Sequence, residues 1–426
     1  MIESLMKAFT IPELKRRIQF NLMMFAVFVL GAHIPVPGVN HDRLEALFGQ
    51  GGFFGLVDVF SGGALRKMTI FAMGITPYIN ASIIMQMMTL AIPQLEQMSK
   101  EGEAGRKRIA KITRYLTIAL ATFQALGFSF TFRDASTGAL GIFQMVVVMT
   151  AGTVFLLWVG EQITERGIGN GVSLVIFAGI MTSLPFQTGL IMQSVREGVV
   201  PWINVIALVA LFIGTIFFIV MITQGTRRIP IQHVKRVVGM RSPTGSFLPI
   251  KVNTAGVIPI IFAIALLLFP AQILGAFPAK PDSFLKHLQN MANALSPGAS
   301  WYGMLVYAGL IVVFTYFYTA VVMNVQDMAD NLKKYGNFIP GIRPGRPTFE
   351  YLDRVVSRIT LAGAVFLACV ALMQYVAPLI THVSLSQFAL IGGTSLLIVV
   401  GVAIETMQAI EAQLLMRNYE GFIKES

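Results

Sequence analysis

The feature that most constrains this chain is a succession of ten apolar stretches, with most of the charged residues confined to the segments between them. A helix needs about 20 apolar residues to cross the hydrocarbon core of a bilayer. The chain is 55% hydrophobic and 12% charged, a composition that excludes a soluble globular domain. The stretches fall at about 18–34, 73–92, 115–132, 140–160, 172–190, 202–223, 253–276, 302–324, 359–380 and 388–408. We therefore predict an all-α, multi-pass membrane protein with ten transmembrane helices.

The distribution of lysine and arginine predicts the orientation, because cytoplasmic loops carry an excess of both. With the N-terminus placed in the cytoplasm, 25 of the 32 lysines and arginines lie on the cytoplasmic side. We therefore expect both termini in the cytoplasm. The spans divide into an N-terminal half, 1–190, and a C-terminal half, 191–426. Because each half has an odd number of spans, a repeat relating them would be inverted in the membrane, which places a pathway at their interface.

One apolar segment, from Phe53 to Leu65, is too short to cross the membrane and is followed by the charged pair Arg66 and Lys67. Such a segment between two spanning helices is tolerated only where protein or a water-filled cavity receives it. We interpret it as a re-entrant plug for such a cavity.

Several kinds of chemistry find no support in the sequence. It has no phosphate-binding G-x-x-x-x-G-K-[ST] loop and no H-E-x-x-H metal pair, and its single cysteine, Cys369, excludes an intramolecular disulfide. The GIGNG run at 167–171 follows no predicted strand, so we interpret it as a tight turn between two helices rather than a dinucleotide fingerprint. We predict neither an enzyme nor a cofactor.

Ionisable residues, the usual markers of ion-coupled transport, are nearly absent from the middle of the spans. Glu161 and Glu405 lie near span ends, and Asp58 lies in the short segment. This counts against the main alternative function, a secondary transporter of a small solute. An intramembrane enzyme, a third hypothesis, lacks a catalytic constellation.

The spans carry isoleucines at helical spacing instead. Ile75 and Ile79 share a helical face with Ser82, Ile176 and Ile180 repeat the spacing, and Ile261 and Ile398 lie deep in other spans. Packed or lipid-facing aliphatic surface shows the same spacing, so spacing alone does not define a ring. The polar side chains of Thr76, Asn80, Ser82 and Gln86 are compatible with helix packing or with a gate.

Two cytoplasmic segments, 224–252 and 325–358, are long, polar and basic. The first carries Arg227, Arg228, Lys235, Arg236 and Arg241, a cationic surface suited to acidic or phosphate-rich partners. In the second, Arg343 precedes Pro344, which favours an extended backbone there. Anchoring by the positive-inside rule and recognition of a partner both account for these charges.

Six motifs together resemble the SecY family, the channel subunits of the bacterial protein-translocation complex. They are FSGGAL (60–65), GITPYINASIIMQ (74–86), GIGNGVSLVIFAGI (167–180), LPIKVNTAGVIP (248–259), ADNLKKYGNFIPGIRPG (329–345) and GGTSLLIVV (392–400). The resemblance covers essentially the whole chain in order. It departs around Met240 and Arg241, where a basic pair common in the family is a single arginine.

The resemblance implies two five-helix halves around a pore in the bacterial cytoplasmic membrane, through which preproteins pass and from which hydrophobic segments leave into lipid. It implies a plug of Phe54, Leu56, Val57, Asp58, Val59, Phe60, Ser61, Gly62, Gly63, Ala64 and Leu65. It implies a pore ring of Ile75, Ile79, Ile176, Ile180, Ile261 and Ile398. It implies a lateral gate near Asn80, Ser82 and Gln86.

The resemblance also implies partners. The implied partners are small membrane subunits of the SecE and SecG type, the SecA motor ATPase, and the ribosome. The docking residues would be Arg227, Arg228, Lys235, Arg236, Arg241 and Arg343. An aliphatic constriction suits such a channel, because specific polar contacts would trap some of the sequences that must pass.

Overall fold

The computed structural model describes residues 8–37, 63–132, 138–233, 246–275, 284–295, 300–381 and 393–424, together with Met6, Val39, Ser61 and Pro297. The described chain is predominantly α-helical, and a helix overlaps each predicted apolar stretch. These helices are α2 (Pro12–Gly31), α5 (Thr76–Ala91), α7 (Glu103–Thr131), α8 (Ala139–Arg166), α9 (Gly171–Arg196), α10 (Trp202–Gln224), α11 (Ile258–Gly275), α13 (Trp301–Val322), α15 (Arg346–Thr381) and α17 (Gly393–Lys424). The other elements are the short helices α6 (Pro93–Lys100), α12 (Phe284–Leu295) and α14 (Val325–Lys334), and the strands β1 (Thr226–His233), β2 (Ser246–Lys251) and β3 (Asn337–Phe338).

Six helical stretches in the described part of the chain are long and apolar enough to cross a membrane. They are α8, α9, α10, the stretch formed by α13 and α14, α15 and α17. The chain is thus a helical membrane protein, while its ten-span layout in two halves stays a prediction.

Helix ends differ from the predicted stretches for two physical reasons. Helices α7, α15 and α17 continue beyond the apolar stretches into charged sequence, because lysine, arginine and glutamate are good helix formers in water. In contrast, α5 has only 16 residues, a rise of about 24 Å at 1.5 Å per residue. Its start is set by turns through Gly74, whose φ of 56° is left-handed.

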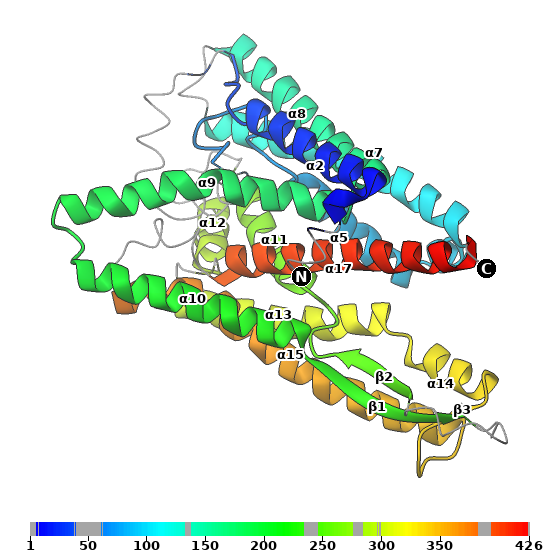
Figure 1. The fold of residues 1–426 in the computed structure, drawn as a ribbon. Helices are drawn as coiled ribbons and strands as arrows, with labels where there is room; N and C mark the ends of the chain where they lie inside the picture. The colour runs from blue at the N-terminus through cyan, green and yellow to red at the C-terminus, as the bar shows by residue number, and fades with distance from the viewer. Residues whose placement is uncertain are drawn as a thin grey trace.

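The long helices form two groups joined by a central set (Figure 1). Helices α2, α7 and α8 lie along one side, and α10, α13 and α15 along the other, with α5, α9, α11 and α17 between them. Contacts between the predicted halves run from α9 to α17 and from α5 and α7 to α11. One large apolar cluster extends across both groups.

The two long basic segments, predicted as loops, form one small structured unit at one end of the bundle (Figure 1). Strand β1 pairs antiparallel with β2, with Ile229 opposite Leu248, and with β3, with Gln232 opposite Phe338. The sheet order is therefore β2-β1-β3, and it joins residues about a hundred positions apart. We call β1, β2, β3, α14 and the first three turns of α15 the platform.

The GIGNG run is a turn between α8 and α9, as predicted. The Asn21 side chain of α2 fixes this turn: its Nδ2 donates to the Ile168 carbonyl at 3.0 Å, and its Oδ1 accepts from the Ile168 N–H at 3.4 Å. Asn170 caps α9 by accepting from the N–H groups of Val172 and Ser173. A Cβ at Gly167 would lie 1.9 Å from Asn21 Oδ1, so only glycine fits there.

Candidate functional site

The six isoleucines predicted to line the pore come from four helices that are distant in sequence. Ile75 and Ile79 stand at the start of α5, Ile176 and Ile180 in the first three turns of α9, Ile261 in the first turn of α11, and Ile398 in the second turn of α17.

All six isoleucines belong to one apolar environment. Five are buried members of the same cluster, and Ile79 is half-buried and packs against it. By comparison, Ile213 on α10 is 61% exposed, as expected of a lipid-facing position. Burial places five of the six in the interior and Ile79 at its edge, and their role as a pore ring stays a prediction.

The predicted plug falls mostly outside the described residues. Its positions Phe54, Leu56, Val57, Asp58, Val59, Phe60 and Gly62 lie there. The described end of the segment is anchored: the Ser61 hydroxyl accepts from the Leu65 N–H at 3.1 Å, and Ala64 and Leu65 are fully buried in the main cluster.

The base of this segment is closed by two backbone hydrogen bonds. The Val36 N–H donates to the Met68 carbonyl at 2.8 Å, and the Ile70 N–H donates to the Ile34 carbonyl at 3.0 Å. These bonds join the chain just after α2 to the chain just before α5.

Aromatic packing holds this base against the N-terminal helices. The Phe71 ring stacks on Phe28 of α2 and on Phe155 of α8, with centroid separations of 5.8 and 6.0 Å. Glycines on both helices make room, because a Cβ at Gly31 would overlap the Phe71 ring and one at Gly152 would overlap the Ile70 carbonyl. The base is therefore packed tightly against α2 and α8.

The polar residues of α5 lie where this helix meets its neighbours. Helix α5 packs against α7 and α11. Asn80 is buried, while Ser82 and Gln86 are half-buried and joined to each other, Gln86 Nε2 donating to Ser82 Oγ at 3.4 Å. This bond is internal to α5, so it places no constraint on the separation of α5 from α11.

The platform has its own apolar core. Residues from both basic segments contribute to it: Ile229, Ile250, Ala329, Leu332, Ile339, Leu352 and Val356. Alternation along β1 contributes to this, because Ile229 and Ile231 share one strand face and pack in this core, while Arg228 and Gln232 lie on the other face and are exposed. The sequence offered only a weak signal for the sheet, because a proline such as Pro230 is unusual inside a strand and β3 has only two residues.

The predicted docking arginines that the structure describes are all exposed on the platform. Arg227 and Arg228 extend from β1, and Arg343 from the turn between β3 and α15. A hydrogen bond ties this turn to the start of α15: the buried Thr348 hydroxyl donates to the Arg343 carbonyl at 2.8 Å. Lys235, Arg236 and Arg241 lie outside the described residues.

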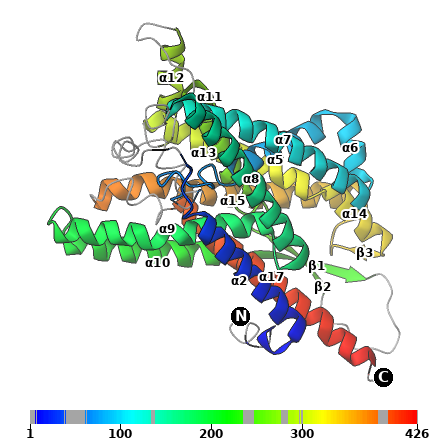
Figure 2. The same ribbon diagram turned by 90° about the horizontal axis from the view of Figure 1, so that it is seen from above.

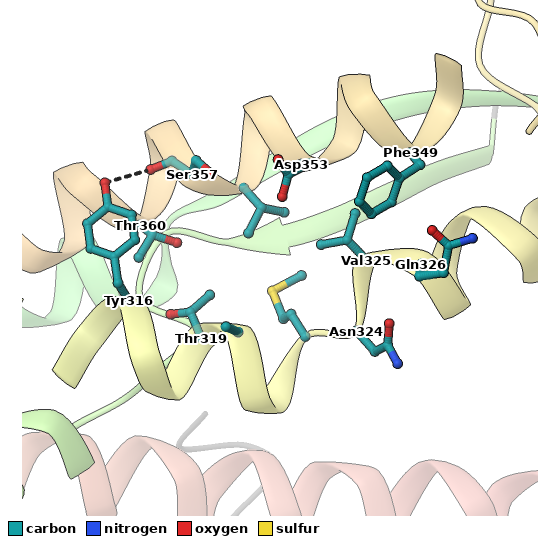
Figure 3. Close-up of a pocket in the computed structure, with 12 residues that line it drawn as sticks. Tyr316, Thr319, Asn324, Val325, Gln326, Phe349, Asp353, Ser357 and Thr360 are labelled. Atoms are coloured by element: carbon teal, nitrogen blue, oxygen red, sulfur yellow. Dashed lines mark hydrogen bonds between the residues drawn. The ribbon is translucent and has the colours of Figure 1, made fainter. Parts of the chain in front are cut away.

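A cavity of about 250 Å³, not anticipated from the sequence, lies where the platform meets the bundle (Figure 3). Its walls are α13, the start of α14 and α15, and the residues that line it include Tyr316, Phe349 and Asp353. The Tyr316 hydroxyl donates to the Ser357 carbonyl at 3.2 Å and joins α13 to α15. In the described part of the chain, no group of three His, Cys, Asp or Glu side chains could hold a metal ion.

Comparisons with known proteins agree with this architecture. The sequence model of the SecY family matches residues 69–407. The protein translocase subunit SecY of Staphylococcus aureus is 42% identical, over 99% of each chain.

Solved structures show the same fold. One is a SecY channel whose plug domain is described as stabilising the closed state and maintaining a membrane seal. Its TM-score is 0.66 at 20% sequence identity, and the match covers 93% of this chain and 92% of that one. Another is Sec61 in the canine ribosome-channel complex, with a TM-score of 0.60 at 17% identity over the same shares.

Proposed function

This chain belongs to the SecY family of protein translocase subunits, and we propose how its residues build the protein-conducting channel of that family. The channel passes unfolded preproteins across a membrane and lets hydrophobic segments leave sideways into lipid. It is not an enzyme, and the alternative of a small-solute transporter is set aside by the family membership.

The constriction of the pore is formed by Ile75, Ile79, Ile176, Ile180, Ile261 and Ile398. The observation that carries this proposal is their convergence from four helices on one buried apolar cluster. A narrow aliphatic ring expels water when it is empty, and it offers no charge or hydrogen bond that would hold one substrate sequence more tightly than another.

The segment from Phe54 to Leu65 is the plug of this channel. Its support is the closed base at Ile34–Val36 and Met68–Ile70, which is held against the core around Phe71. A related SecY channel has a plug domain that stabilises its closed state.

The lateral gate lies between α5 and α11, next to Asn80, Ser82 and Gln86. These helices come from different halves and pack against each other. Apolar segments of a substrate leave through this gate because hydrophobic transfer favours lipid over a wet pore.

The platform is the docking surface for the partner that drives the chain. Its exposed arginines suit the phosphates of a ribosome or acidic groups of a motor ATPase of the SecA type. Canine Sec61, a structural neighbour, was solved in a ribosome-channel complex. Small membrane subunits of the SecE and SecG type complete the assembly.

We further propose ten spans in two inverted halves, 1–190 and 191–426, in the bacterial cytoplasmic membrane, with both termini and the platform in the cytoplasm. The support is the placement of 25 of the 32 lysines and arginines on one side.

Disulfide crosslinking to an arrested substrate tests the constriction. The variant Ile180→Cys, made in a Cys369→Ser background, is incorporated with its partner subunits into vesicles, and a preprotein carrying one cysteine is arrested in transit by a folded domain. We expect crosslinks at Ile180→Cys and none at the matched control Ile213→Cys on the exposed face of α10. Equal crosslinking at both positions, or none at Ile180→Cys, would contradict the assignment.

A further inference from the structure

The short helix α12 has one apolar face that is not covered by the described part of the protein. At 100° per residue, Phe284, Leu288, Met291 and Leu295 share one face of the helix. The Phe284 side chain is 76% exposed and that of Met291 is 59% exposed. The opposite face carries Lys286, Asn290 and Asn293, all exposed. This division is typical of a helix that lies in the plane of a membrane surface.

Contacts on both neighbouring helices fix the orientation of α12. The Gln289 Nε2 donates to the Leu274 carbonyl at the end of α11, at 2.7 Å, and Ala292 is buried beside them. The Ser300 hydroxyl, which caps α13, donates to the Ala294 carbonyl at 2.5 Å. The apolar face is therefore held outward by the fold.

Helix α12 lies at one end of the two helices that it joins. It connects the end of α11 to the start of α13, and so lies at the end of these helices opposite the platform. Figure 2 shows it at the edge of the molecule, next to α11 and away from α9 and α10. The first two residues of α13, Trp301 and Tyr302, are both exposed there, and such aromatic residues gather at the boundary between lipid and water.

We propose that α12 is an interfacial anchor that binds phospholipid at the membrane surface opposite the platform. The face of Phe284, Met291 and Leu295 lies at the boundary between headgroups and acyl chains, and Lys286 and Asn290 face water. Lipid is the occupant that the structure favours, because α12 joins the apolar helix α11 to the membrane helix α13 beside an aromatic pair and carries no acidic residue. This role does not depend on the proposed function, since lipid contact needs neither substrate nor motor.

Fluorescence quenching in vesicles tests the anchor. The variants Met291→Cys and Asn293→Cys, two residues apart in sequence and about 160° apart around the helix axis, are labelled with an environment-sensitive dye in the Cys369→Ser background. The full complex is then studied with lipids that carry a spin label near the headgroup or at the end of the acyl chain, and with iodide in the water. We expect the dye at Met291→Cys to be quenched several-fold more by the shallow lipid label than the dye at Asn293→Cys, and several-fold less by iodide.

Three results would overturn the proposal. Equal iodide quenching at the two positions would place the apolar face in water. Protection of Met291→Cys from both iodide and lipid labels would mean that protein covers it. Stronger quenching by the deep lipid label than by the shallow one would place the helix inside the bilayer rather than at its surface.

Discussion

Replacement of Ile180 by alanine tests whether the buried isoleucines seal the channel. The Ile180 side chain is 1% exposed and lies in the large apolar cluster with Ile75 and Ile398. Truncation of a fully buried isoleucine to alanine costs roughly 2–5 kcal/mol, because transfer free energy is lost and a cavity remains. We take about 3 kcal/mol for this position.

The effect on gating depends on whether the closed state alone, or both the closed and the open state, loses this stabilisation. If Ile180 lines the constriction, its contacts exist when the ring is closed and are replaced by water or substrate when it opens. The loss then falls on the closed state, and about 3 kcal/mol shifts the closed-to-open equilibrium by roughly 100-fold, since 1.4 kcal/mol is a factor of ten. If Ile180 were ordinary core, both states would lose the same contacts and the gating equilibrium would not change.

Open probability of the complex without substrate, measured in planar bilayers, distinguishes these cases. We expect a large increase in resting ion conductance for Ile180→Ala. The variant Ile180→Leu keeps the side-chain volume and should differ little, since such exchanges usually cost less than about 1.5 kcal/mol. Ile213→Ala, at a lipid-exposed position, should match the unmodified channel. The reasoning is refuted if Ile180→Ala lowers thermal stability while its resting conductance equals that of Ile180→Leu.

Three further predictions concern the plug, the platform and the turn after α8. Deletion of Phe54–Phe60, with the buried Ala64 and Leu65 kept in place, should make the resting channel leak ions, and unchanged conductance would contradict the plug. Arg343→Glu should impair preprotein transport in vesicles supplied with the motor and ATP. The control Arg346→Glu should have a smaller effect, because Arg346 is paired with Glu350 of the same helix. Normal export by Arg343→Glu would exclude a docking role for Arg343. Asn21→Ala should lower the free energy of unfolding by about 1–3 kcal/mol, because it removes the side chain that pairs with the buried backbone N–H and C=O of Ile168. An unchanged melting temperature in detergent would refute this prediction.

The helical character of the chain was predictable because the bilayer imposes it. A membrane-spanning segment must satisfy its own backbone hydrogen bonds and match the thickness of the lipid, so length and hydropathy suffice to find helices such as α8 and α10. The turn at GIGNG was predictable for a similar reason, since glycines between two apolar runs leave few other structures. Burial of Ile180 and Ile398 agrees with an inward orientation, which the spacing alone could not distinguish from a lipid-facing one.

The platform was beyond the reach of local patterns. Its sheet pairs Gln232 with Phe338, and such pairing depends on contacts between distant parts of the chain rather than on propensity along one segment. The hydropathy of 224–252 and 325–358 indicated only polar sequence outside the membrane. The lengths of α7 and α15 were missed because a hydropathy window ends where lipid ends, although a helix can continue into water.

The continuity of α15 gives the platform a mechanical connection to the membrane helices. This helix runs without a break from Arg346, next to the exposed Arg343, to Thr381, and it packs against α10, α11, α13 and α17. The chain after β2 passes close to α15 at Gly363. A Cβ at this position would lie 2.8 Å from the Val252 carbonyl oxygen, so the glycine allows the close approach. Lys251 adds a hydrogen bond to Gln408 of α17, at 3.1 Å. A partner that displaces the platform must therefore displace α15 and its neighbours, including α11, which contacts α5 across the proposed gate. Docking on the platform and opening of the proposed gate would then both act through α15, because α15 contacts α11 and α11 contacts α5.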